Sequence, residues 1–89
     1  MADRLRLRIY TPEREVADVE VREVTAPATL GEIGVLPDHA ALVTSLDPGT
    51  LSYREAAGAK TVRLTIGAGF AEVRDNVMTV LTDSAAEAA

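Results

Sequence analysis

The sequence predicts an all-β domain, folded as an antiparallel sandwich or barrel of short strands. Three observations lead to this prediction. Several runs of about six residues alternate between polar and hydrophobic side chains, which is the period of a half-buried strand. Gly, Pro, Asp and Asn separate these runs at intervals of roughly 6 to 12 residues. Helical periodicity is nearly absent before residue 84, and the chain is rich in Val, Ile and Thr, which suit a pleated surface.

The first two strands are expected at residues 4–9 and at about residues 14–24. In the first, arginine alternates with Leu or Ile, so one face is apolar and the other carries only arginine. We expect acidic neighbours opposite these arginines on the adjoining strand. Thr11-Pro12 ends the strand, because proline lacks the N–H that a ladder needs. The alternation of the second strand slips at Glu23-Val24, which predicts a bulge or the end of pairing.

The middle of the chain is expected to be less regular. Residues 26–37 contain two prolines and two glycines, which predicts irregular structure or very short strands. The apolar run 41–46 predicts another short strand, and Asp47-Pro48-Gly49 after it predicts a turn.

Two hairpins are expected in the second half. Residues 51–53 and 61–66 alternate again and are joined by a loose loop. Asp75-Asn76 predicts a two-residue hairpin turn, since both residue types tolerate positive φ. This turn sets a register that pairs Val73 with Met78 and places Glu72 opposite Thr79. Gly67-Ala68-Gly69 is expected to let the chain bend into the hairpin.

The last residues depart from the strand pattern. Ser84-Ala85-Ala86-Glu87 fits a capping box, in which the serine and the glutamate satisfy each other's free backbone donors. The sequence therefore predicts a truncated helix start at the C-terminus. This prediction divides the chain into a β-sandwich domain, residues 1–83, and a tail, residues 84–89.

Composition excludes several classes of function. A net charge of -5 and a pI near 4.7 disfavour nucleic acid as a partner. Without cysteine, and with one histidine, the chain offers neither a disulfide framework nor a zinc site, and no cofactor is expected. No apolar run approaches the roughly 18 to 20 residues of a membrane span, and the start lacks the pattern of a signal peptide.

A block in the middle of the chain has a specific resemblance. Gly31-Glu32-Ile33-Gly34-Val35-Leu36-Pro37-Asp38-His39-Ala40, followed by Leu46-Asp47-Pro48-Gly49-Thr50-Leu51, resembles the signature of the epsilon subunit of F-type ATP synthases, which is called delta in organelles. Thr11–Arg14, Gly69–Val73 and Val80–Ala85 add matches in the same order. The resemblance covers essentially the whole chain.

The resemblance implies a flattened β-sandwich of about ten short strands at the foot of the central stalk. Such a subunit is non-catalytic, binds the gamma subunit and the membrane-embedded c-ring, and turns with both as part of the rotor. It would be peripheral to the membrane, on the cytoplasmic side of the bacterial plasma membrane. Members of the family usually continue into two C-terminal helices that can inhibit ATP hydrolysis. This sequence ends where the first of these would start, so neither inhibition nor nucleotide binding by them is carried over.

The resemblance also implies which residues meet each partner. Gly31, Glu32 and Ile33 correspond to the segment that contacts the c-ring. The positions that approach gamma are Thr11, His39, Leu42 and Thr44. An exposed ion pair formed by Glu32 is worth only about 0 to 1 kcal/mol, so firmer attachment must come from apolar area. The alternation around Leu42 leaves open whether its side chain faces a partner or the core.

Two other classes of function are open to this sequence. Asp38 and His39 could form half of an acid–base site in a small hydrolase, but no nucleophile stands at a convincing spacing unless folding brings Ser45 or Ser52 near. A free-standing sandwich that binds a small ligand or a peptide edge would also suit an all-β chain. It would leave the glycine-rich block unexplained.

Overall fold

The computed structural model describes residues 2–88, and this part of the chain forms nine β-strands and no helix. The strands are β1 (Leu5–Tyr10), β2 (Glu15–Ala28), β3 (Gly31–Val35), β4 (Leu42–Leu46), β5 (Gly49–Glu55), β6 (Thr61–Ile66), β7 (Gly69–Arg74), β8 (Val77–Thr82) and β9 (Ala85–Glu87). The prediction of an all-β sandwich is confirmed.

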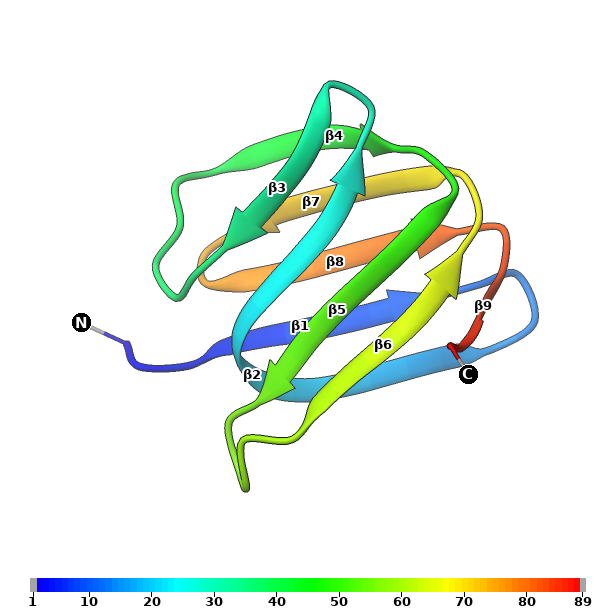
Figure 1. Ribbon diagram of the computed structural model, residues 1–89. Helices are drawn as coiled ribbons and strands as arrows, with labels where there is room; N and C mark the ends of the chain where they lie inside the picture. Colours follow the sequence, from blue (N-terminus) through cyan, green and yellow to red (C-terminus); the bar gives the residue numbers. More distant parts are fainter. Residues whose placement is uncertain (1, 89) are drawn as a thin grey trace.

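The strands lie in two layers that face each other across the core (Figure 1). One layer contains β1, β8, β7 and β4 in that order, and the other contains β5, β6 and β9 with β3 and the end of β2. β1 and β8 run parallel, and every other pairing among the described strands is antiparallel. β2 is the longest strand and belongs to both layers, because its first half pairs with β1 and its second half with β5 and β3.

β2 changes layers at an irregularity that the sequence predicts. The register of β2 against β5 shifts between Val21 and Glu23, close to the predicted slip at Glu23-Val24. A bulge bends its strand and increases the local twist, which lets one strand leave one layer and enter the other. The strand then continues through Pro27 to Ala28, further than the sequence predicts. Proline keeps an extended φ, and the Pro27 carbonyl still accepts a hydrogen bond from the Asp47 N–H at 2.8 Å.

The core between the layers consists almost entirely of aliphatic side chains. Leu5, Leu7 and Ile9 are fully buried, as the alternation in the first strand predicts. The other large side chains that are fully buried are Leu51, Ile66, Met78, Val21, Val24, Val35, Val73 and Val80. These side chains belong to one contiguous hydrophobic cluster, whose close packing holds the two layers together. Among residues 2–88, no buried side-chain nitrogen or oxygen lacks a hydrogen-bond partner.

The hairpin of β7 and β8 has the predicted turn and register. Asp75 and Asn76 have φ values of 53° and 61°, and Val73 pairs with Met78 while Glu72 pairs with Thr79. The predicted hairpin of β5 and β6 is also present.

The predicted helix start at Ser84–Glu87 is wrong. Ala85–Glu87 form β9, which pairs with β6 from Leu64 to Ile66, and Ala85 packs against the core. A helix this short is marginal in water, whereas the open edge of β6 has free backbone N–H and C=O groups with which an added strand can pair. The division of the chain after residue 83 stays a prediction, and residues 1 and 89 of its two ranges lie outside the described residues.

Gly69 is required for a close approach of two strands. It lies at the start of β7, and a Cβ added there would overlap the backbone carbonyl of Leu81 on β8. At the predicted bend of residues 67–69, Gly69 is therefore needed because it has no Cβ. It is not needed for a left-handed backbone, since its φ lies outside that region.

We expect Gly69→Ala to destabilise the domain by about 1 to 3 kcal/mol, because the backbone of β8 must shift to admit the methyl group. Urea unfolding followed by circular dichroism measures this. Gly34→Ala is the matched control, since a Cβ on Gly34 meets nothing within 4 Å. Equal stability of the two variants would contradict the close-approach explanation.

Candidate functional site

A cluster of exposed hydrophobic side chains lies on the outer face of β4, β7 and β8. Val43, Phe70 and Leu81 are 71%, 61% and 54% exposed. Together with Glu72 and Thr79 they line one shallow hollow. Phe70 pairs with Leu81, and Leu81 with Tyr10, so the apolar row continues onto β1. We call Tyr10, Val43, Phe70 and Leu81 the outer apolar patch.

A second exposed feature is the β2–β3 turn together with the first two residues of β3, residues Thr29–Glu32, which we call the hairpin tip. Leu30 is 101% exposed there, Gly31 has a φ of 130°, and Glu32 is exposed. Ile33, the third predicted c-ring contact, is partly buried and packs against the core. The tip therefore presents one apolar and one acidic side chain.

Hydrogen bonds hold the hairpin tip against β4. The Thr29 N–H donates to the Ser45 carbonyl at 3.0 Å. The two hydroxyls of these residues are 2.7 Å apart, and the Thr29 hydroxyl donates to Asp47 Oδ1 at 3.2 Å. Because Ser45 pairs with Phe70, the hairpin tip adjoins the outer apolar patch. In Figure 1 this turn and β4 lie together at the top of the molecule.

The four predicted gamma contacts do not form one cluster. Thr11 follows the end of β1, beside Leu81, whereas His39 precedes the start of β4, at the opposite end of that layer. Leu42 and Thr44 are partly buried and pair with the buried Val73 and Ala71, on the inner side of β4. Val43 between them faces outward.

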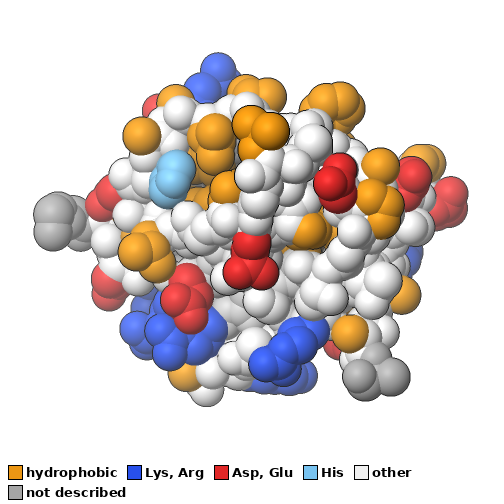
Figure 2. Space-filling model, turned by 45° about the horizontal axis from the view of Figure 1, so that its top comes forward, with side chains coloured by type: hydrophobic (Ala, Val, Ile, Leu, Met, Phe, Trp, Pro, Cys, Tyr) orange, Lys and Arg blue, Asp and Glu red, His pale blue; other side chains and the backbone are white. Residues whose placement is uncertain are grey.

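The histidine and its acidic neighbour do not form an acid–base pair. The His39 ring Nδ1 lies 2.7 Å from the Ala40 carbonyl, and the Asp38 carboxylate accepts a hydrogen bond from the Ala2 N–H, also at 2.7 Å. The Ser45 hydroxyl is engaged with Thr29. Figure 2 shows the histidine in pale blue on the surface, close to hydrophobic groups, while most Lys and Arg groups gather lower in the view.

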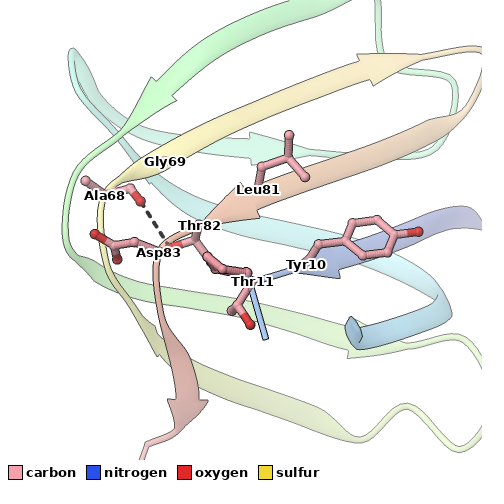
Figure 3. A pocket seen from close by; sticks show the side chains of 8 residues that line it. Tyr10, Thr11, Ala68, Gly69, Leu81, Thr82 and Asp83 are labelled. Carbon is pink, nitrogen blue, oxygen red and sulfur yellow. Dashed lines mark hydrogen bonds between the residues drawn. The ribbon is translucent and has the colours of Figure 1, made fainter. Parts of the chain in front are cut away.

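The pocket beside Thr11 is an open groove at one end of the sandwich. Its lining includes Tyr10, Gly69, Leu81 and Asp83, with Tyr10 and Leu81 on neighbouring strands (Figure 3). The buried Thr82 hydroxyl lies within 3.1 to 3.2 Å of the carbonyls of residues 67, 68 and 84, so it has partners within the fold. Residues 2–88 contain no group of three His, Cys, Asp or Glu placed to hold a metal ion.

The arginine row on β1 is paired with carboxylates of β2, as the alternation predicts. Arg6 Nε donates to Asp18 Oδ1 at 2.6 Å, and Arg8 Nε lies 3.6 Å from the same oxygen. Arg4 pairs with Glu20 at 3.5 Å. The hydrogen bond from Arg6 lowers the pKa of Asp18 below its usual 3.8, and the charges of Arg6 and Arg8 act in the same direction. This face is a set of exposed ion pairs rather than a free basic surface.

Comparison with known proteins relates the whole described sandwich to one family. Residues 4–88 match the family described as "ATP synthase, Delta/Epsilon chain, beta-sandwich domain". The chain belongs to this family.

Relatives in the family include the ATP synthase epsilon chain of Carboxydothermus hydrogenoformans, 47% identical over 85 residues, and that of Pelotomaculum thermopropionicum, 46% identical over 83 residues. These matches cover 96% and 93% of this chain but only 62% and 60% of the two relatives. A chain in the cryo-EM structure of the Euglena gracilis mitochondrial ATP synthase superimposes with a TM-score of 0.89 at 29% identity, covering 98% of this chain and 55% of that one. Within residues 2–88, no helix is long and apolar enough to cross a membrane.

Several residues of this epsilon-type domain were missed by reasoning from the sequence. Val43, Phe70 and Leu81 alternate with buried or partly buried neighbours, so the period of two could have placed them outside. It does not show that three strands bring them together. Leu30 could have been found as a large apolar residue beside a glycine in a turn.

We expect Asp18 to stabilise the fold above about pH 4 and to lose this effect as the pH falls through its lowered pKa. The sign follows because the carboxyl of Asp18 has a higher pKa in the unfolded chain than in the folded protein. As the pH falls, the unfolded chain therefore binds the proton first. Asp18→Asn should therefore flatten the acid limb of the unfolding free energy below about pH 5. Unfolding by guanidinium at several pH values measures the free energy of unfolding along this limb. Asp75→Asn is the control, since its carboxylate is 90% exposed and 3.9 Å from the nearest arginine nitrogen; equal flattening by both would contradict the assignment.

Proposed function

We propose that this chain is a non-catalytic rotor subunit of a proton-translocating F-type ATP synthase that couples the c-ring to the gamma subunit. Family membership supports the proposal, and so does the superposition on a chain of an ATP synthase structure whose described contents include F1 and the c-ring. The subunit would lie peripheral to the membrane, on the cytoplasmic side in a bacterium. The observation that carries the proposal is that the domain exposes two separate surfaces side by side, the outer apolar patch and the hairpin tip.

The outer apolar patch is suited to gamma. Three large side chains more than half exposed on neighbouring strands are unusual on a surface that faces only water, and such patches mark protein interfaces. Thr11 and His39, predicted from the resemblance, flank the strands that carry the patch. We therefore propose that gamma covers the patch, with Thr11 and His39 near its rim, and that Leu42 and Thr44 support β4 from the inner side.

The hairpin tip is suited to the c-ring. Leu30 supplies apolar area, and Glu32 an acidic group that can meet a basic residue on a loop. Thr29 ties the tip to Ser45 and Asp47, so a load applied at the tip passes into β4, which also carries Val43 of the patch. A mechanical coupling role needs this kind of connection between its two contact surfaces.

The open groove of Figure 3 does not favour a small-ligand binding module over this proposal. Ligand sites are usually concave and carry a few convergent polar groups. In this groove the buried hydroxyl of Thr82 already has carbonyl partners.

We expect Phe70→Asp to weaken binding to gamma by about 10- to 100-fold, because an apolar side chain buried at the interface is replaced by a charge. Biolayer interferometry with immobilised gamma subunit of the source organism measures the affinity. Thr65→Asp is the control, a substitution at another exposed position, on β6 in the other layer. Unchanged binding by Phe70→Asp, with wild-type binding intact, would show that gamma does not cover this patch.

We expect Leu30→Asp to reduce association with the c-ring more than Glu32→Gln. An exposed ion pair contributes about 0 to 1 kcal/mol, whereas burying a leucine contributes about 1.5 to 3 kcal/mol. Co-sedimentation of the gamma-bound chain with c-rings in liposomes measures this, and Thr65→Asp again serves as the control. A larger loss for Glu32→Gln would mean that charge, and not apolar contact, holds the tip.

A further inference from the structure

The side chain of Asn76 does more than its turn requires. Asn76 is the second residue of the β7–β8 turn, where a residue of positive φ is all that the backbone needs. Its Nδ2 nevertheless donates to the Arg4 carbonyl at 2.8 Å, and its Oδ1 accepts from the Asp38 N–H at 2.8 Å. Its own carbonyl accepts from the Arg6 N–H at 3.2 Å. The two side-chain bonds join residues that are 72 and 38 positions apart in the sequence.

The other end of this connection is Asp38, in the loop between β3 and β4. Asp38 has a φ of 63°, and its carboxylate accepts from the Ala2 N–H at 2.7 Å. The start of the chain, the β3–β4 loop and the β7–β8 turn are thus tied into one ring of hydrogen bonds. Asn76 contributes the side chain that reaches both of the other segments.

In the loop from 36 to 41 only Pro37 and His39 are partly buried, and the hydrogen bonds that join the loop to other segments are those of Asp38. Leu36 is 58% exposed, Ala40 and Ala41 are exposed, and the hydrogen bond from the His39 N–H to the Leu36 carbonyl, at 3.1 Å, is local to the loop. The contact with Asn76 therefore fixes the loop relative to the body of the sandwich. A loop that is ordered before binding loses less conformational entropy when a partner covers it.

We propose that Asn76 is a positioning residue for partner binding: it pre-orders the loop that presents His39 and leads into Val43 of the outer apolar patch. This inference rests on the proposed function, since it assigns the ordered loop to the gamma interface. Asn76 itself need not touch gamma. Its effect on affinity would pass through the Asp38 N–H.

The turn allows a clean substitution. Asn76→Gly removes both side-chain hydrogen bonds and keeps the turn, because Asp-Gly is a favoured two-residue hairpin sequence and glycine takes positive φ without strain. Asp75→Gly is the matched control: it changes the neighbouring residue, with a φ of 53°, and leaves the connection to Asp38 intact. Asn76→Asp is an intermediate variant, which keeps an acceptor for the Asp38 N–H and loses the donor to Arg4.

Three quantities are measured for the wild type and each variant: the exchange rate of the Asp38 amide by NMR, the thermal midpoint, and the affinity for the gamma subunit. We expect Asn76→Gly to speed Asp38 exchange at least tenfold and to weaken gamma binding about 5- to 150-fold, the range that the loss of two net hydrogen bonds gives. Asp75→Gly should change neither, and Asn76→Asp should fall between. Across the series, affinity should follow Asp38 exchange and not the thermal midpoint.

Affinity that follows the thermal midpoint, or faster exchange with unchanged affinity, would overturn the positioning role. Unchanged exchange in Asn76→Gly would show that Asn76 does not anchor the loop. If the wild type fails to bind gamma, the proposed function is overturned and the link from Asn76 to gamma falls with it. The exchange rates in that case still decide whether Asn76 orders the loop.

Discussion

Strand β2 is the constraint on which the rest of this domain depends, because it is a member of both layers. Its first half pairs with β1 and its second half with β5 and β3, and the register shift after Val21 lets it turn from one layer into the other. The two layers are thus joined by a continuous backbone as well as by the apolar core between them. A closely packed interior deforms little, so surfaces carried by different layers keep their relative positions.

The two exposed surfaces take their positions from this arrangement. The hairpin tip follows the end of β2, and the hydrogen bonds of Thr29 join it to β4 where β4 lies beside Phe70. The outer apolar patch spreads from there over β4, β7, β8 and β1. One small sandwich therefore exposes two unlike surfaces, one broad and apolar, the other narrow with a leucine and a glutamate at its end. The rotor role that we propose would need both surfaces on one stiff support.

At the opposite end of the layer formed by β1, β8, β7 and β4, hydrogen bonds hold the loops together. There the chain start, the β3–β4 loop and the β7–β8 turn meet around Asn76, and polar groups replace apolar packing as the organising contacts. Short polar side chains that bond the backbone of distant segments can order loops that carry few buried apolar groups. Such loops are common places for recognition, provided that the scaffold positions them.

The sequence by itself determined the features that depend on neighbouring residues. Alternation placed Leu5, Leu7 and Ile9 in the core, Asp75-Asn76 set the register of the last hairpin, and the arginine row predicted its carboxylate partners. Each follows from the period of two or from the φ that a turn demands. The glycine-rich block of residues 31–40 identified the family, because its residues and spacing are specific.

Tertiary structure alone decided how distant segments meet. Ser84–Glu87 satisfies a local rule for a helix start, but the free edge of β6 offered Ala85–Glu87 better partners. Val43, Phe70 and Leu81 became one patch because β4, β7 and β8 are adjacent, and Asn76 became an anchor because the Asp38 and Arg4 backbones pass within hydrogen-bonding distance of it. Local preferences are worth about 1 kcal/mol or less per residue, so long-range pairing and packing outweigh them wherever the two disagree.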